Sequence, residues 1–140
     1  MKNVIVTGGC GFIGSHLSEK LIQLGYKVKI IDNLSTGRLE NISNFKNKIK
    51  FYKLDIKNKN KIENIFKNID IVFHCAALAD IVPSIQKPKS YYDSNVTGSL
   101  NVVSSCVKHN VKKIVYTASS SCYGKCENTP TSEEEKISPE

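Results

Sequence analysis

A run of glycines near the N-terminus has the pattern of a phosphate-binding turn. Within residues 7–16 (TGGCGFIGSH), Gly9, Gly11 and Gly14 fit G-x-G-x-x-G, and Gly8, Gly11 and Gly14 also fit G-x-x-G-x-x-G. Glycine at position 11 would let the backbone approach a pyrophosphate, and glycine at 14 would let a following helix pack closely on a strand. A glycine-rich turn that holds no ligand is the alternative interpretation.

The residues around the glycines predict the setting that such a turn requires. The apolar run 2–6 predicts a buried strand, and apolar residues recur at helical spacing after the turn, at Ile13, Leu17, Leu21 and Leu24. A strand that turns directly into a helix directs free N–H groups and the positive end of the helix dipole at one point. The sequence therefore favours a phosphate site over a simple turn.

An acidic residue follows where a dinucleotide-binding fold needs one. The segment 27–32 predicts a second strand that ends at Asp32, about 20 residues beyond the glycines, where a carboxylate can bind a ribose diol. A carboxylate there would repel the 2′-phosphate of NADP, so Asp32 predicts NAD. Arg38 is the counterargument, because a nearby arginine can bind that phosphate.

Apolar segments with alternating strand and helix character continue along the chain. We expect strands at 2–6, 27–32, 49–54, 69–74 and 113–118, with helices between them and Pro83 and Pro88 in a loop. This order predicts an α/β fold, a doubly wound parallel sheet of five strands with right-handed crossovers.

The helix expected from about Pro88 carries an apolar stripe at helical spacing. Its members are Tyr92, Val96, Leu100, Val103 and Val107. We expect this stripe to face the core.

The unusual residues of the chain fall where the predicted strands end. They are the glycine turn, Asp32, Asp55, the small residues 75–78 and the serines 119–121. Ligands of open parallel sheets bind beyond the carboxyl ends of the strands. This agreement is the main argument for a dinucleotide site.

Composition narrows the other possibilities. The net charge is +7, but nineteen of the twenty basic residues are lysines, which favours a solvated surface over a nucleic-acid interface. Five scattered cysteines suggest reduced thiols and a cytoplasmic location. Cys122 and Cys126 have no second pair to complete a metal site, and no apolar run reaches membrane-spanning length. We expect no signal peptide, since the first residues belong to a strand.

The chain resembles the N-terminal part of extended short-chain dehydrogenases/reductases, in the nucleotide-sugar epimerase/dehydratase group. The matching stretches, in the family's order, are TGGCGFIGSH (7–16), DNLSTGR (32–38), LDI (54–56), VFHCAALADIVPSIQKP (72–88), SNVTGSLNV (94–102) and YTASSSCYG (116–124). This resemblance implies a Rossmann fold that binds NAD, and a nucleotide sugar, UDP-hexose above all, as substrate.

The resemblance also assigns cofactor-binding roles residue by residue. The backbone of Gly11, Phe12 and Ile13 would hold the pyrophosphate, and Asn95 would brace the wall beside the nicotinamide. The full implied set is Gly8, Gly11, Phe12, Ile13, Gly14, Asp32, Asn33, Ser35, Gly37, Asp55, Ile56, Cys75, Ala76, Ala77, Leu78 and Asn95. Asp32 and Asn33 would bind the adenosine ribose, Asp55 and Ile56 would flank the adenine, and 76–78 would line the path to the nicotinamide.

The resemblance implies that Ser119 is catalytic, because it stands four residues before the Tyr-Gly pair. Its hydroxyl would bind the sugar oxygen that becomes a carbonyl; a hydroxyl-lined turn is the alternative. The 4,6-dehydratases of the group have two acids at the position of Ser120 and Ser121, so the serines favour a 4-epimerase. Ala79-Asp80 replaces a lysine found in some galactose-type epimerases, which leaves the sugar open.

The family's catalytic base, a tyrosine with a lysine four residues later, does not occur in the chain. None of the six tyrosines meets that spacing. We therefore expect 1–140 to be the NAD-binding part of a longer enzyme, homodimeric when whole, inactive by itself and poorly covered on one face of its fifth strand. A non-catalytic NAD-sensing module, a 4,6-dehydratase and a basic nucleic-acid binder are the alternatives.

Overall fold

The computed structural model describes residues 2–126 and 129–139. Its centre is a five-stranded parallel sheet with the order β3-β2-β1-β4-β5. The strands are β1 (Asn3–Thr7), β2 (Lys27–Asp32), β3 (Ile49–Lys53), β4 (Ile71–His74) and β5 (Lys113–Tyr116). The predicted doubly wound α/β fold is therefore confirmed, and each strand lies within two residues of its expected bounds.

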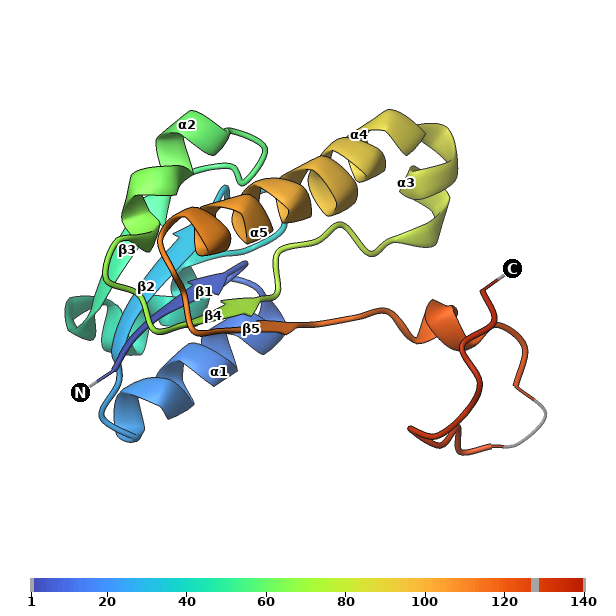
Figure 1. Ribbon diagram of the computed structural model, residues 1–140, viewed down its shortest axis with the longest axis horizontal. Coiled ribbons are helices and arrows are strands. Elements are labelled where there is room, and N and C mark those ends of the chain that lie inside the picture. Colours follow the sequence, from blue (N-terminus) through green and yellow to red (C-terminus); the bar gives the residue numbers. More distant parts are fainter. Residues whose placement is uncertain (1, 127–128, 140) are drawn as a thin grey trace.

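Helices cover both faces of the sheet (Figure 1). One face carries α1 (Phe12–Gln23) and the 3-10 segment η1 (Leu39–Lys48), and the other carries α2 (Lys59–Ile62), η2 (Glu63–Phe66) and α5 (Ser99–Lys108). Between β4 and α5 the chain forms α3 (Ile81–Gln86), α4 (Pro88–Tyr92) and η3 (Asp93–Gly98), of which α3 and α4 extend beyond the sheet (Figure 1). The segment η4 (Ser120–Tyr123) follows the sheet.

Alternate residues of the central strands fill two cores, as expected for a sheet buried on both faces. Val4 and Val6 of β1 pack under α1 and η1, whereas Ile5 packs with Ile62 and Phe66 beneath α2, η2 and α5. The chain leaves β1 toward β2 on one side and returns to β4 on the other. The carboxyl ends of β1 and β4 therefore border the crevice where open α/β sheets bind ligands.

The prediction that the stripe of the long helix is buried is wrong. Its five residues, Tyr92, Val96, Leu100, Val103 and Val107, are 43–73% exposed. The buried side of the same helix is made by Gly98, Val102, Ser105 and Cys106. We call the exposed stripe the outer face of α4–α5.

The last sheet strand has little cover. All four residues of β5 are exposed, so both faces of the strand have little cover where one poorly covered face was expected. The chain then runs away from the body of the protein through η4 (Figure 1). Pro83, expected in a loop, instead lies within α3, whereas Pro88 lies at the start of α4, where the long helix was expected to begin. Within the described residues no helix is both long and apolar enough to cross a membrane.

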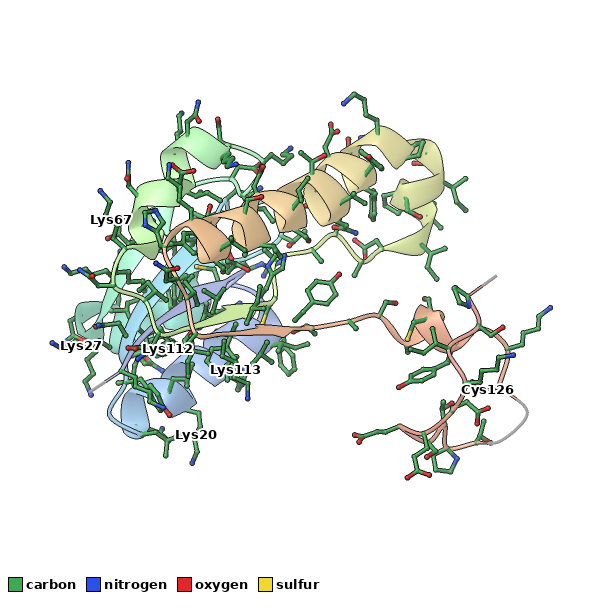
Figure 2. The ribbon with its side chains drawn as sticks, in the orientation of Figure 1. Lys20, Lys27, Lys67, Lys112, Lys113 and Cys126 are labelled. Carbon is green, nitrogen blue, oxygen red and sulfur yellow. The ribbon has the colours of Figure 1, made fainter. Side chains whose placement is uncertain are left out.

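Lysines gather at the end of the molecule where the strands begin. Figure 2 shows Lys20, Lys27, Lys67, Lys112 and Lys113 projecting outward there. They lie at the end of α1 or just before or at the start of β2, β4 and β5. These five positive charges thus lie at the opposite end of the sheet from the crevice.

Candidate functional site

The turn after β1 needs glycine at position 8. Gly8 has a φ of +68°, and its N–H donates to Ile31 O at 2.8 Å. A Cβ there would lie 2.8 Å from the Cα and N of Ala76 at the end of β4. Backbone atoms cannot yield at that distance, so the turn and the end of β4 are in direct main-chain contact.

Glycine is also required where α1 begins. A Cβ at Gly14 would lie 2.2 Å from Gly8 O, and no other residue type lets the helix approach the turn so closely. Gly11 precedes the helix without a capping side chain. The N–H groups of the first turn therefore face the crevice without a side-chain acceptor, together with the positive end of the helix dipole.

Asp32 is fixed at the end of β2 by two backbone donors. Its side chain accepts from Cys10 N at 2.9 Å and from Leu34 N at 2.8 Å, and the residue is only 7% exposed. The bond to Cys10 ties the carboxylate to the glycine turn. Burial, with a smaller contribution from the Asp32 charge, raises the pKa of the Cys10 thiol to about 12. A Cβ at Gly37 would come within 3.0 Å of both carboxylate oxygens.

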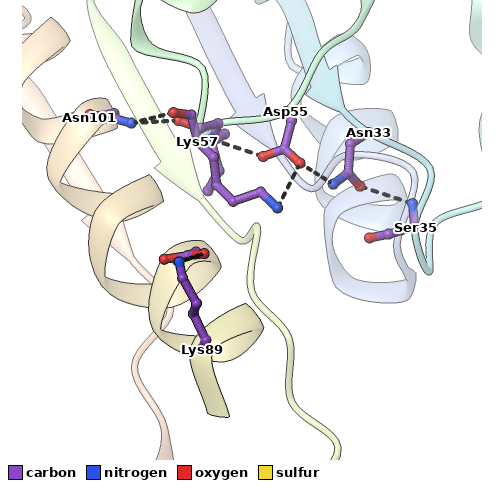
Figure 3. A network of polar contacts seen from close by, with 8 residues as sticks. Asn33, Ser35, Asp55, Lys57, Lys89 and Asn101 are labelled. Atoms are coloured by element: carbon purple, nitrogen blue, oxygen red, sulfur yellow. Dashed lines mark hydrogen bonds and ion pairs between the residues drawn. The ribbon is translucent and has the colours of Figure 1, made fainter. Parts of the chain in front are cut away.

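A second carboxylate, Asp55, links the ends of β2 and β3 (Figure 3). Asn33 Nδ2 donates to Asp55 at 3.0 Å, while Asn33 Oδ1 accepts from Ser35 N at 2.9 Å. Burial opposes ionisation of Asp55, but hydrogen bonds from the Lys57 backbone and from Asn33, with the Lys57 charge, lower its pKa overall. Through Asn33, the ionised Asp55 carboxylate thus ties the loop after β2 to the segment after β3.

Ile56 is held from the other side by the long helix. Asn101 Nδ2 donates to the carbonyls of Ile56 and Lys57, both at 3.0 Å (Figure 3). The Ile56 side chain lies against Gly98, where a Cβ would come within 2.7 Å of it. Ile56, which is 5% exposed, is thereby fixed as an apolar residue of the cleft lining beyond the end of β3.

The wall that continues β4 consists of residues 75–78. Cys75 N donates to Thr7 O at 3.1 Å, and Ala76 N donates to Thr7 Oγ1 at 3.2 Å. Asn95 holds Leu78 by both of its amide atoms, accepting from Leu78 N and donating to Leu78 O, each at 2.9 Å. Cys75, Ala76 and Ala77 have small side chains, so this part of the wall takes up little of the cleft that it lines.

These pieces surround a cleft of about 230 Å³. Fourteen of the sixteen expected cofactor residues line it: Gly8, Gly11, Phe12, Ile13, Gly14, Asp32, Asn33, Ser35, Gly37, Ile56, Cys75, Ala76, Ala77 and Leu78. Asp55 and Asn95 support the lining from behind through their hydrogen bonds. The cleft is also lined by four residues that were not among the expected cofactor residues, Ile31, Thr36, Leu54 and Ser94. Thr36, Leu54 and Ser94 lie in stretches that resemble the family, and Ile31 lies in β2.

Ser119 lies beyond β5, on the exposed segment that leaves the sheet. Its Oγ accepts from Ser121 N at 3.2 Å and donates to Ser121 Oγ at 3.0 Å. It follows a strand that ends on the same edge of the sheet as the cleft, although it is not among the cleft-lining residues described above. Among the described residues, no three His, Cys, Asp or Glu side chains gather where a metal could bind.

The geometry suits a dinucleotide. Gly8 and Gly14 let the turn, the start of α1 and the end of β4 meet backbone to backbone, the helix N-terminus lines the cleft, and Asp32 stands one strand away. None of the cleft-lining residues is a lysine or an arginine, so amide groups and the helix dipole would neutralise the phosphates. Fold and site together define a dinucleotide-binding protein of the Rossmann type.

Comparison with known proteins identifies the family. The model of the NAD dependent epimerase/dehydratase family matches residues 4–140, and the chain belongs to this family. The expected resemblance and the expected cofactor, NAD, are thereby confirmed for the family.

Individual relatives agree. A UDP-glucose 4-epimerase of Dictyostelium discoideum is 38% identical and aligns with 96% of the chain. The UDP-N-acetylglucosamine 4-epimerase of Methanobrevibacter ruminantium, solved with UDP-N-acetylmuramic acid, superposes with a TM-score of 0.88 at 42% identity over 99% of the chain. The UDP-glucose 4-epimerase of Bifidobacterium longum, solved with NAD+ and UDP, gives 0.89 at 36% over 98%. The chain spans 41%, 44% and 43% of these proteins, respectively.

Proposed function

We propose that this chain is the NAD-binding part of a nucleotide-sugar 4-epimerase with UDP-hexose as substrate. The observation that carries the proposal is the glycine turn joined to Asp32 through the Cys10 amide, since this unit combines a phosphate site with a ribose acceptor. The relatives named above are UDP-sugar 4-epimerases, which supports the reaction class.

The chain's residues bind and orient rather than react. Amides of Gly11, Phe12 and Ile13 hold the pyrophosphate, and the free lone pairs of Asp32 accept from the adenosine ribose hydroxyls. Ile56 would border the adenine, with Asp55 supporting the cleft behind it, and the wall 75–78 would border the nicotinamide. When bound, NAD would supply the hydride chemistry for oxidation and reduction at C4 of the sugar.

Ser119 is the proposed catalytic residue of the chain. Its hydroxyl donates a hydrogen bond to the C4 oxygen of the sugar and so keeps that oxygen in place as a carbonyl develops. The neighbouring Ser120 and Ser121 offer no carboxylate to protonate a leaving hydroxyl, which favours epimerisation over 4,6-dehydration. The chain has no Tyr-x-x-x-Lys pair, so we expect cofactor binding without turnover.

Calorimetric titration with NAD+ and NADP+ tests the proposal. We expect NAD+ to bind and NADP+ to bind at least tenfold more weakly, because Asp32 repels a 2′-phosphate. A folded chain that binds neither would refute the cofactor site, and steady epimerisation of UDP-glucose by the chain alone would refute the assignment of an essential base elsewhere.

We also propose that the whole enzyme is a homodimer that uses the outer face of α4–α5. Five apolar side chains at helical spacing are exposed there, and a contiguous apolar patch of this kind is typical of a protein–protein interface. Sedimentation velocity of the chain should show concentration-dependent self-association that Val103→Lys weakens and Asn64→Lys, on η2, leaves unchanged. Equal association of both variants would place the interface elsewhere, and a strictly monomeric chain would refute this use of the face.

A further inference from the structure

A chain of hydrogen bonds runs through the core behind the wall 75–78. Thr7 Oγ1 lies 2.6 Å from His74 Nδ1, and His74 Nε2 lies 2.9 Å from Ser99 Oγ. Ser99 Oγ in turn lies 2.6 Å from Asn95 O. Thr7 is fully buried and His74 is 1% exposed, so water cannot replace the bond between them, whereas Ser99 and Asn95 are half-buried. We call Thr7, His74, Ser99 and Asn95 the buried relay.

The donors and acceptors of the relay fit only one arrangement of protons. The only hydrogen of Ser99 Oγ goes to the carbonyl of Asn95, so His74 Nε2 must carry a hydrogen and donate it to Ser99. The neutral imidazole then has no hydrogen on Nδ1, which accepts from the Thr7 hydroxyl. Thr7 Oγ1 keeps a lone pair for Ala76 N, which lies 3.2 Å away.

Burial reinforces this arrangement, because it lowers the pKa of His74 to about 4. A second proton on the ring would have to sit on Nδ1, and the bond from Thr7 would be lost. The ring of Tyr116 on β5 lies beside the imidazole, 5.5 Å between centroids, and covers it on that side.

Both ends of the relay terminate on the wall. At one end Thr7 Oγ1 accepts from Ala76 N. At the other, Ser99 holds the carbonyl of Asn95, whose side chain binds both backbone groups of Leu78. Asn95 lies in the π-helical segment η3, so the relay also fixes the irregular turn that presents its side chain.

We infer that His74 is a positioning residue for NAD: locked as the Nε2–H tautomer between Thr7 and Ser99, it sets the wall 75–78 against which the nicotinamide end lies. This inference rests on the proposed function, because it takes the wall to be the nicotinamide side of the cleft. It assigns His74 no contact with the cofactor and no proton transfer. The imidazole acts by fixing two backbone amides, those of Ala76 and Leu78.

Hydroxyl variants with a matched control test the inference. Thr7→Val and Ser99→Ala each remove one partner of His74, whereas Thr7→Ser keeps the hydroxyl. Ser105→Ala is the control: Ser105 is buried on the same helix and bonds the carbonyl four residues earlier at 2.7 Å, as Ser99 does, but it does not contact His74. Calorimetry with NAD+ should show about tenfold weaker binding for Thr7→Val and Ser99→Ala. Thr7→Ser and Ser105→Ala should bind like the unmodified chain.

Nitrogen NMR and amide exchange provide a readout that does not depend on NAD. His74 should show a protonated Nε2 and an unprotonated Nδ1, and Ala76 and Leu78 amides should exchange faster in Ser99→Ala than in Ser105→Ala. The opposite tautomer, or equal exchange and NAD+ affinity in these two variants, would overturn the inference. If the unmodified chain binds no NAD+, the proposed function fails and the cofactor role of His74 with it. Exchange then still decides whether the relay holds the wall.

Discussion

Substituting Gly14 and Gly11 separately should distinguish a glycine that the fold requires, at position 14, from a glycine that NAD+ binding requires, at position 11. A Cβ at Gly14 would lie 2.2 Å from Gly8 O and 2.8 Å from Gly9 Cα, both backbone atoms. In Gly14→Ala, α1 must therefore move by roughly 1 Å from the turn, an overpacking that costs about 3 kcal/mol of unfolding free energy. We expect both lower stability and lost NAD+ binding.

Gly11→Ala should behave differently. Gly11 has a φ of −76°, which alanine adopts freely, and the nearest atom to an added Cβ is Gly8 O at 3.3 Å. Alanine also restricts the unfolded chain, so stability should stay within about 1 kcal/mol of the unmodified protein. Because Gly11 lines the cleft, the new methyl group occupies the approach of the pyrophosphate, and NAD+ affinity should fall at least tenfold.

Urea unfolding followed by circular dichroism gives the two stabilities, and calorimetry gives the two affinities. Gly14→Ala with unchanged stability would show that the helix is not held against the turn as described. Gly11→Ala with unchanged NAD+ affinity would show that the backbone at position 11 does not meet the phosphates.

Three further predictions follow from the buried groups. Because burial lowers the pKa of His74 to about 4, the unfolded chain binds the extra proton first. Stability is therefore full above about pH 6.5 and falls by about 3 kcal/mol as pH drops to about 4; a flat urea midpoint over that range would contradict this. Burial also raises the pKa of Cys10 to about 12 and of Cys106 to about 11, so mass spectrometry should find both alkylated by iodoacetamide after Cys75, Cys122 and Cys126. Asp32→Asn should weaken NAD+ binding and cost about 2 kcal/mol, since one of two backbone donors loses its acceptor. Calorimetry and urea unfolding check this, and Asp93→Asn is the control, because the half-buried Asp93 carboxylate pairs with Lys89 and not with a backbone donor of the cleft.

The elements that sequence predicts well are those whose signal is local. The glycine turn, Asp32 at the end of β2 and the small residues after β4 each follow from a strand end and a few adjacent residue types. Once five strands alternate with helices, topology brings their carboxyl ends together. The location of the cleft therefore needed no long-range information.

The side of the long helix that is buried could not be read from hydropathy. Helical spacing shows that Leu100, Val103 and Val107 share a face, but it does not show which face meets the sheet. The buried side of the helix includes Gly98 and Ser105. Neither residue is strongly apolar, so hydropathy does not predict that they are buried. Gly98 is small because Ile56 lies against it, a contact between residues far apart in the chain.

The hydrogen-bond partners of His74 could not be predicted from the sequence either, because they too are residues far away in the chain. The sequence predicts a structural role for this histidine, with its imidazole hydrogen-bonded within the turn at the end of its strand. Its hydrogen bonds go to residues 67 positions before it and 25 after it. Such pairs depend on the register of β1 with β4, in which Thr7 lies opposite His74.

The main-chain contact between Gly8 and Ala76 has a consequence for recombination between relatives. The phosphate turn and the wall are shaped against each other, although 60 or more residues of sequence separate them. A chimaera that takes the N-terminal turn from one relative and the end of β4 from another would place two backbone segments in contact that differ from those of either parent, so we expect the contact to be strained or lost. Crossover points placed after Leu78 keep the two in one parent, and such hybrids should retain the cofactor cleft while exchanging everything downstream.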